Sequence, residues 1–307
     1  MHVARCEGTC LASPSMSGQG VVCLGEALAV LDAVGDRTWR AGVGGAEANV
    51  AWGLAVLGVP ATFVTRLGAD PFGDLVQADL TAAGVRVLGA RDEVRPTGAY
   101  VKTAASRMHY YRSGSAASAM CADLLDRPDV AEALAQCAVV HTSGITAGVL
   151  ADDTLLHRLV GERDRLGFTL CVDLNWRPAL WHGRDHDALV DLLSLADVVL
   201  LGADEALAAL GTADVAGLRS RLGPRPRLVL KSDAHEATEV EPSGASTTVP
   251  ALSVDVVEPI GAGDGFAAGY LTGLVEGLDP AERLGLGHRV AASVLTHRGD
   301  HLLEDPR

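Results

Sequence analysis

The glycine-rich turn Gly261-Ala262-Gly263-Asp264 has the residue types of a phosphoryl-transfer site. It stands directly before a helical run from Ala267 to Val275. Glycines ahead of a helix let backbone N–H groups approach an anion closely, and the helix dipole adds to the attraction for negative charge. An aspartate at the same point can take the proton from an attacking hydroxyl group. The alternative is that Asp264 only caps the helix, because aspartate is a favoured N-cap residue.

A second glycine-rich segment, residues 42–49, has the composition of a sugar-binding loop. It reads Gly42-Val43-Gly44-Gly45-Ala46-Glu47-Ala48-Asn49 and opens an amphipathic helix that is predicted to run to Leu57. The bare backbone at Gly44 and Gly45 would let a sugar lie against the chain. Asn49 can both donate hydrogen bonds to hydroxyl groups and accept them. A flexible loop ahead of an ordinary helix is the other interpretation of this segment.

Alternating strand and helix patterns predict the framework that must position these two segments. Short apolar runs of strand length lie at 21–24, 62–65, 139–141, 170–173, 198–201 and 228–231. Ala-rich and Leu-rich segments lie between them at 47–57, 73–83, 152–166 and 204–210. Continuous apolar strands separated by helices indicate parallel strands that are covered on both faces. The sequence therefore predicts an α/β fold with a doubly wound, mostly parallel sheet.

Two segments, 26–41 and 95–112, interrupt this alternation. They are richer in β-branched or aromatic residues and carry turn signals in place of helix patterns. We expect them to form a small antiparallel sheet that lies as a lid over the main domain, because ligands of α/β proteins bind outside the carboxyl ends of the strands. Exposed sheets readily pair with a copy of themselves, so a homodimer or higher homo-oligomer through the lid is predicted.

Length and composition limit the kinds of protein that this chain can be. The 307 residues are 48% hydrophobic, which is enough for one large domain, predicted at residues 21–303 after a disordered leader at 1–20. The formal net charge of −14 argues against nucleic acid or an anionic membrane as the main partner. No apolar stretch of membrane-spanning length occurs. Without a secretory signal or a disulfide framework, a cytoplasmic location is predicted.

Taken together, the two glycine-rich segments resemble the ribokinase (PfkB-type) family of carbohydrate kinases. Residues 44–51 and the following stretch 67–73, Leu-Gly-Ala-Asp-Pro-Phe-Gly, are similar to the amino-terminal signature of that family, and the turn 261–264 is similar to its carboxy-terminal signature. The resemblance extends from about Val21 to Asp300. It implies a ribokinase-like fold, ATP with Mg²⁺ as the phosphoryl donor, and Asp264 as the general base. It also implies an anion hole made by the N–H groups of Gly261, Ala262 and Gly263.

Three further stretches, 110–117, 173–181 and 298–300, are similar to 2-keto-3-deoxygluconate kinases within that family. The resemblance implies that Tyr110, Arg112 and Arg177 contact an acid sugar. Arginine suits this role because it forms paired, charge-assisted hydrogen bonds to a carboxylate. The predicted substrate-binding residues are Gly44, Gly45, Asn49, Tyr110, Arg112, Arg177 and Asp300. The alternatives are that Tyr110 belongs to a lid core and that Arg177 is an ion-pair partner of Asp173.

Two segments depart from the family pattern near the expected ions. Glu258-Pro259-Ile260 stands where the family usually has Asp-Thr-Thr ahead of the turn, and this weakens the prediction of a monovalent cation. The segment 202–205 reads Gly-Ala-Asp-Glu and keeps only the glutamate of the Asn-x-x-Glu that the family associates with magnesium. Glu205 is therefore the predicted metal contact, through water; the alternative is that it simply belongs to the first turn of a helix.

The predicted nucleotide loop departs further. It reads Lys231-Ser232-Asp233-Ala234-His235-Glu236-Ala237, and the family usually has glycines here. Carboxylates at Asp233 and Glu236 would repel a triphosphate unless they point away or bind metal. The predicted ATP-binding residues are Lys231, Ser232, Ala234, Gly261 and Gly263.

The sequence therefore predicts a kinase that phosphorylates the terminal hydroxyl of a keto-deoxy sugar acid such as 2-keto-3-deoxygluconate. The alternatives are a kinase of another sugar (fructose or ribose) or of a nucleoside, and a non-catalytic sugar or nucleotide sensor of the same fold. A dinucleotide oxidoreductase is disfavoured, because no Gly-x-Gly-x-x-Gly follows the first predicted strand.

Overall fold

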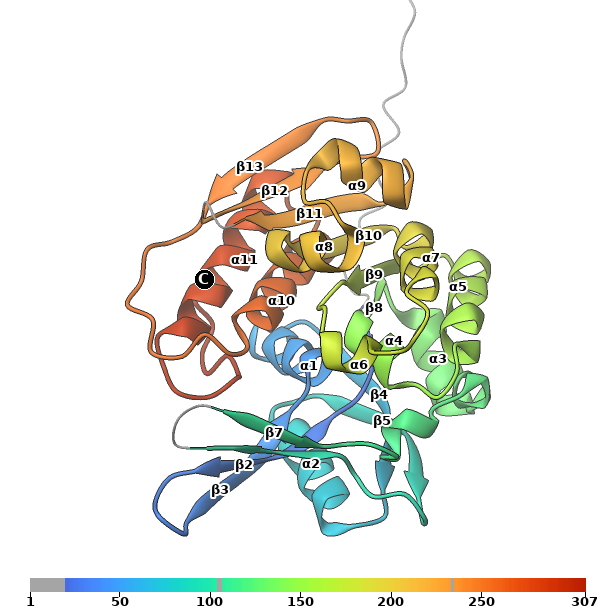
Figure 1. The fold of residues 1–307 in the computed structure, drawn as a ribbon, viewed down its shortest axis with the longest axis vertical. Helices are drawn as coiled ribbons and strands as arrows, with labels where there is room; N and C mark the ends of the chain where they lie inside the picture. Colours follow the sequence, from blue (N-terminus) through green and yellow to red (C-terminus); the bar gives the residue numbers. More distant parts are fainter. Residues whose placement is uncertain (1–19, 104–106, 233–234) are drawn as a thin grey trace, which may run out of the picture.

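A nine-stranded sheet forms the centre of the molecule, and helices cover both of its faces (Figure 1). The computed structural model describes residues 20–103, 107–232 and 235–307. The predicted leader therefore lies outside the described residues except for Gly20, and Asp233 and Ala234 of the predicted nucleotide loop lie outside them as well.

The strands are β1 (Val21–Leu24), β2 (Leu28–Ala33), β3 (Trp39–Gly44), β4 (Ala61–Gly68), β5 (Arg86–Asp92), β6 (Ala99–Lys102), β7 (Met108–Tyr111), β8 (Val139–Ser143), β9 (Thr169–Asp173), β10 (Val198–Gly202), β11 (Arg227–Ser232), β12 (Glu236–Val240) and β13 (Ser246–Pro250). The α-helices are α1 (Ala46–Val56), α2 (Pro71–Ala82), α3 (Pro128–Gln136), α4 (Gly144–Val149), α5 (Thr154–Leu166), α6 (Pro178–Trp181), α7 (Asp187–Leu195), α8 (Ala203–Leu210), α9 (Val215–Leu222), α10 (Ala262–Val275) and α11 (Pro280–Leu295). Two 3₁₀ turns, η1 (Ala117–Ala119) and η2 (Ala122–Asp126), precede α3.

The large sheet has the order β13-β12-β11-β10-β9-β8-β1-β4-β5. All pairs from β11 to β5 are parallel, and β12 and β13 add an antiparallel edge. Each of the six predicted apolar runs lies in a strand of this sheet, which confirms the predicted doubly wound α/β fold. The chain order reverses between β1 and β8, and ligands of such sheets bind at this point.

Two apolar cores pack against the two faces of the large sheet. One holds side chains of α3, α5, α7, α8 and α9 against alternate strand residues such as Val140, Val172 and Leu201. The other holds side chains of α1, α2 and α10 against the intervening residues, including Cys171 and Leu200. Burial of both faces explains why these strands are apolar at successive positions.

A smaller sheet with the order β3-β2-β6-β7 lies beside the large one. It corresponds to the segments 26–41 and 95–112, although β3 continues to Gly44, so that part of the predicted glycine-rich loop is strand. The pairs β2–β3 and β6–β7 are antiparallel, as expected, but β2 and β6 run parallel. These two strands are not joined by a hairpin, because β3, α1, β4, α2 and β5 intervene along the chain.

Among the described residues, no helix is both long enough and apolar enough to span a membrane.

Candidate active site

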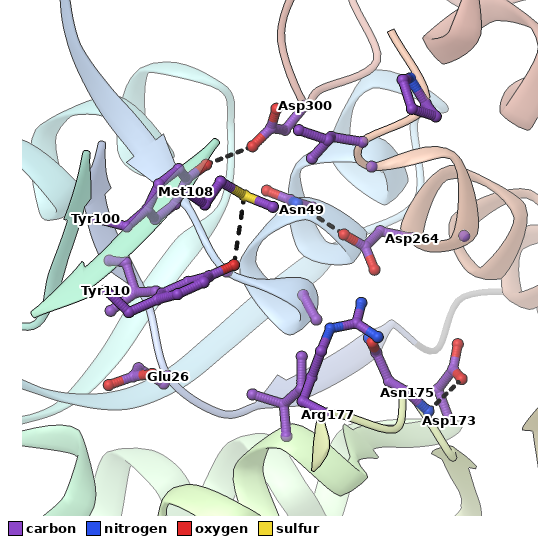
Figure 2. Close-up of a pocket in the computed structure, with 18 of the residues that line it drawn as sticks. Glu26, Asn49, Tyr100, Met108, Tyr110, Asp173, Asn175, Arg177, Asp264 and Asp300 are labelled. Carbon is purple, nitrogen blue, oxygen red and sulfur yellow. Dashed lines mark hydrogen bonds between the residues drawn. The ribbon is translucent and has the colours of Figure 1, made fainter. Parts of the chain in front are cut away.

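A cavity of about 390 Å³ lies between the small sheet and the carboxyl ends of the large sheet's strands. Figure 2 shows how its side chains converge: Tyr100 and Tyr110 come from the small sheet, Arg177 from the segment after β9, and Asp264 from the start of α10. Its lining includes most of the residues that the sequence singled out: Gly45, Asn49, Tyr110, Arg112, Arg177, Glu205, Lys231, Gly261, Gly263, Asp264 and Asp300.

Asp264 lies in the first turn of α10, where Gly261 is the N-cap residue and no side chain forms the cap. The helix-capping alternative for Asp264 is therefore wrong. Its carboxylate instead accepts a hydrogen bond of 2.7 Å from the side-chain amide of Asn49 (Figure 2). The two glycine-rich segments, 215 residues apart in the chain, thus meet through this one bond.

The surroundings of Asp264 favour its protonated form. Burial is the main cause, the negative charges of Asp173 and Glu47 add to it, and the Asn49 bond opposes it; together they raise the pKa of Asp264 to about 7. A carboxylate with a pKa near the working pH can accept a proton and later return it to solvent, as general-base catalysis requires.

The turn before Asp264 exposes backbone N–H groups to the cavity. Gly261 has φ +81°, a conformation that glycine adopts without strain. The first N–H groups of a helix have no partner within the helix, so those of residues 262–264 are available to an anion. Gly263 is exposed and lines the cavity, whereas the side chain of Ala262 does not line it.

Charged residues at the ends of β9, β10 and β11 form one wall of the cavity. The Lys231 ammonium lies 3.6 Å from the Asp173 carboxylate, and Arg177 forms a 3.0 Å ion pair with Glu205. Arg177 is therefore an ion-pair partner, but the predicted partner Asp173 is wrong: Arg177 pairs with Glu205, and Asp173 pairs with Lys231. Although burial opposes its charged form, the carboxylates of Asp173, Glu205 and Asp264 raise the pKa of Lys231.

A second arginine approaches the cavity from the lid side. Arg112 forms a 2.9 Å ion pair with Glu26, whose other oxygen accepts a hydrogen bond from Ser115. Burial raises the pKa of Glu26, and Arg112 and Ser115 oppose that rise. The Arg112 guanidinium also stacks over the Tyr110 ring, with 4.5 Å to the centroid. Tyr110 in turn packs against Tyr100 and lines the cavity, but it is 45% exposed, so it belongs to the lid without lying in a lid core.

Of the residues with predicted roles that the structure describes, three do not line the cavity: Gly44, Ala262 and Ser232. Gly44 lies against Tyr100, because a Cβ atom there would come within 2.8 Å of the tyrosine hydroxyl. It therefore supports the cavity wall from behind. Gly45, with φ +124°, lies against the Glu26 carbonyl and faces the cavity.

Several residues in or beside the site were not identified from the sequence: Glu26 and Tyr100 line the cavity, and Glu47 and Lys102 lie outside its lining. Glu26 lies two residues after the end of β1, so the rule that ligands bind at the carboxyl ends of strands would have identified it. Glu47 is fully buried and accepts 2.6 Å hydrogen bonds from Ser143 and Thr146. No local pattern marks it, since its partners lie almost 100 residues away.

Among the described residues, no group of three or more His, Cys, Asp or Glu side chains could hold a metal ion without other ligands. Glu205, the predicted metal contact, lines the cavity but is bonded to Arg177. Burial and the nearby Asp173 raise its pKa.

Comparison with known proteins gives a consistent result. Residues 19–305 match the model of the pfkB family carbohydrate kinases. The chain is 33% identical to a 2-dehydro-3-deoxygluconokinase of Thermoproteus tenax over 98% of this chain and 97% of the relative. It is 31% identical to a fructokinase of Klebsiella pneumoniae over 75% of this chain and 76% of the relative. The crystal structure of fructokinase with bound ATP from Xylella fastidiosa superposes with a TM-score of 0.80 at 25% identity, covering 92% of this chain and 93% of that one.

Proposed function

The chain belongs to the pfkB family of carbohydrate kinases and is a phosphotransferase with an alcohol group as acceptor, and we propose that its acceptor is a keto-deoxy sugar acid. The substrate class is that of 2-keto-3-deoxygluconate (2-dehydro-3-deoxygluconate), phosphorylated at the terminal hydroxyl. The relative from Thermoproteus tenax carries the corresponding name and matches nearly the whole chain.

The observation that carries this proposal is that two guanidinium groups, Arg112 and Arg177, line the same cavity as Asp264. Each already has a carboxylate partner, Glu26 or Glu205. Among the described residues, the hydrogen bonds of both guanidinium groups run through Nη1. A guanidinium has five N–H donors in a planar fork, so donors remain for a substrate carboxylate. A neutral sugar requires no cationic partner.

Asp264 is the proposed general base. With its pKa near 7, the carboxylate is poised to take the proton from the sugar hydroxyl. The hydrogen bond from Asn49 fixes the orientation of the carboxylate. Positioning and charge stabilisation supply most of the catalysis in phosphoryl transfer, because the protein has little covalent chemistry to perform.

ATP is the proposed donor, and the residues present fit its phosphates. The N–H groups of residues 262–264 form an anion-binding helix start, and the Lys231 ammonium approaches the same turn, since a Cβ atom on Gly263 would lie 3.9 Å from Nζ. When bound, ATP supplies the transferable phosphoryl group. We propose that the turn and Lys231 would stabilise the negative charge on this phosphoryl group.

Mg²⁺ is proposed to enter with the nucleotide. This ion keeps several water molecules and usually binds through one or two carboxylates together with substrate phosphates. The Glu205 carboxylate would hold such a water molecule. Binding of the hydrated ion would draw this carboxylate away from its ion-pair partner Arg177. The arginine would then be freer to bind the sugar acid.

The test is a substrate panel on purified protein. Arg112→Ala and Arg177→Ala are each expected to lower kcat/KM for 2-keto-3-deoxygluconate by about tenfold to hundredfold, the range for a lost hydrogen bond to a charged group. Neither should lower kcat/KM for fructose or ribose to the same degree. Arg86→Ala, on the exposed side of β5, is the matched control. Equal losses on acid and neutral sugars would contradict the carboxylate-binding role.

A neutral sugar is the second candidate, and two observations favour it. The arginines are partly neutralised by Glu26 and Glu205, and the chain matches a relative named fructokinase at 31% identity. In that case the panel would show fructose as the best substrate, and Arg112→Ala would reduce its turnover only through loss of lid packing.

A further inference from the structure

A buried lysine joins the lid to the catalytic turn. Lys102, the last residue of β6, forms an ion pair with Glu258, and its ammonium lies 3.7 Å from the Asp300 carboxylate. The side chains of Lys102, Glu258 and Asp300 are exposed by only 7%, 7% and 9%. None of the roles proposed so far uses Lys102, and it does not line the main cavity.

The two carboxylates belong to segments that shape the anion-binding turn. Glu258 stands three residues before Gly261, and its second oxygen accepts a 3.1 Å hydrogen bond from the N–H of Gly299. Asp300 accepts a hydrogen bond from the hydroxyl of Tyr100, also in β6 (Figure 2). Gly261 rests directly on the backbone of Asp300, since a Cβ atom there would meet the Asp300 carbonyl oxygen at 2.3 Å. The Lys102 ammonium therefore bridges β6, the 258–261 segment and the 299–300 segment.

Electrostatics requires a cation at this position. Two buried carboxylates without a partner would repel each other, and an uncompensated buried charge destabilises a fold strongly. A lysine ammonium is a compact point charge, which resembles a monovalent metal ion more closely than a planar guanidinium does. The sequence contains two lysines, Lys102 and Lys231. Lys231 lines the cavity, and Lys102 contacts Asp300, which lines it as well.

We propose that the Lys102 ammonium is a built-in cation that holds the lid and the Gly261 turn in one arrangement and takes the place of a dissociable monovalent cation. A separate ion does not fit, because the ammonium already contacts the carboxylates that would attract it. This inference rests on the proposed kinase function and assigns Lys102 as a positioning residue. It touches the anion-binding turn only through Glu258 and Asp300.

The proposed positioning role predicts that loss of Lys102 affects kcat and KM to different degrees. Lys102 positions N–H groups that stabilise charge in the transition state, so its loss should lower kcat more than it raises the KM for the sugar. Cavities of about 420 and 600 Å³ flank Lys102 on the lid side. A small ion can therefore reach the space that a truncated side chain would leave.

The experiment is rescue by cations at constant ionic strength. Lys102→Ala is assayed for sugar-dependent ADP release in choline, sodium, potassium and ammonium chloride, next to the unmodified protein. We expect at least a tenfold loss of kcat in choline chloride, recovery of several-fold in potassium or ammonium, and no cation dependence of the unmodified protein. The double variant Lys102→Ala/Glu258→Gln, which lacks one of the carboxylates, should lose the rescue.

Two results would overturn the proposal: unchanged kcat of Lys102→Ala in choline, or a folded Lys102→Ala that no small cation reactivates. If Lys102→Ala does not fold in any of the salts, Lys102→Gln, which keeps a side chain of similar length, takes its place. A kcat for Lys102→Gln equal to that of the unmodified protein would then overturn it.

A second readout does not depend on turnover. A cation that binds the native state of Lys102→Ala raises its melting temperature, so potassium should stabilise this variant relative to choline and leave the unmodified protein unchanged. If the unmodified protein turns over no sugar, the proposed function fails, whereas the melting experiment still decides the role of Lys102. Equal melting temperatures of the variant in potassium and choline would contradict that role.

Discussion

At the scale of single residues, Asp264 is defined by what surrounds it. The same carboxylate at the exposed start of a helix would be an ordinary anion with a low pKa. Here burial and the charges of Asp173 and Glu47 raise its pKa to about 7, while the Asn49 amide holds it in place. An aspartate that is costly for the fold as an anion is well suited to accept a proton during catalysis.

The pH dependence of activity follows from this. As the proposed base, Asp264 would work only when deprotonated, so kcat/KM is expected to fall tenfold per pH unit below about pH 7 and to level off above it. The Asn49 bond lowers the pKa of Asp264, so Asn49→Ala should move the acid limb to higher pH. The measurement is initial rate against pH for both proteins. An acid limb that lies at the same pH in both would contradict the assignment.

Stability should respond in the opposite direction to activity. The pKa of Asp264 is higher in the folded protein (about 7) than in the unfolded chain, so the folded state binds the extra proton. Stability from this group is fully present below about pH 4 and is lost as the pH rises to 7. Asp264→Asn carries no charge, so at pH 8 it should be more stable than the unmodified protein by ~4 kcal/mol, because each of the roughly three pKa units of the shift is worth about 1.4 kcal/mol.

Denaturant unfolding of both proteins at pH 5 and pH 8 checks this. The advantage of Asp264→Asn should be larger at pH 8 and smaller at pH 5. An Asn variant that is less stable at both pH values would show that the charged carboxylate stabilises the fold.

At the scale of elements, two helix starts bring the two glycine-rich segments together. Helix α1 begins after Gly45 and helix α10 after Gly261, and both glycines have positive φ. The two helices pack against each other, for example where Gly53 of α1 meets Ala268 of α10. The helix packing therefore fixes the distance between Asn49 and Asp264.

Gly261→Ala tests the turn. The new Cβ atom would come within 2.3 Å of the Asp300 carbonyl oxygen, so the turn has to shift. We expect a loss of about 1–3 kcal/mol from the free energy of unfolding and a loss of kcat of at least tenfold.

Gly211→Ala is the matched control, because Gly211 has a similar φ of +76° and nothing within 4 Å of the added atom. It should lower stability and leave kcat unchanged. The role of the turn would be contradicted if Gly261→Ala kept the kcat of the unmodified protein. Thermal melts and initial rates on the two variants make the comparison.

Buried strands were easier to predict from the sequence than strands at the edge of the sheet. Parallel strands covered on both faces are continuous apolar runs, so β1, β8 and β10 were recognisable from the sequence. The antiparallel edge strands β12 and β13 carry polar residues that alternate with more buried ones and are partly or fully exposed, such as Glu236, Thr238 and Ser246, and they were missed. The glycine-rich turns were recognisable because few residues other than glycine tolerate their backbone.

The partners of the charged residues were harder to predict. Arg112 pairs with Glu26, which is 86 residues away, and Lys102 pairs with Glu258 across more than half of the chain. No local pattern encodes such contacts. The sequence identified Arg112 and Arg177 as candidate ligands of a carboxylate, and the structure adds that each already has a carboxylate partner.

At the scale of the whole molecule, the proposed active site joins the two halves of the chain. Glu26, Asn49 and Arg112 come from the first half, and Arg177, Asp264 and Asp300 come from the second. The small sheet belongs to the first half and contacts the second through Lys102 and Tyr100. The lid therefore contacts the segments on either side of the proposed anion-binding turn directly.

Self-association through the lid stays a prediction. Its strands carry exposed apolar side chains, including Trp39 (46% exposed) and Tyr111 (67%). Sedimentation at micromolar concentration should give at least twice the mass of the 31.7 kDa chain, and Tyr111→Glu should shift it toward a single chain. Leu207 on α8 is similarly exposed (60%), so Leu207→Glu is the control and should leave the mass unchanged. A single-chain mass for the unmodified protein would contradict the prediction.

The most direct test of the account is a coupled ADP-release assay with 2-keto-3-deoxygluconate, ATP and Mg²⁺ on the unmodified protein and on Asp264→Asn. Asparagine preserves the shape of the side chain and an oxygen for the Asn49 bond but cannot act as a base. A general-base role of Asp264 predicts clear turnover by the unmodified protein and a loss of about 10²–10⁴-fold in kcat in the folded variant, the usual contribution of a general base. Turnover by the unmodified protein that does not exceed that of Asp264→Asn would contradict it.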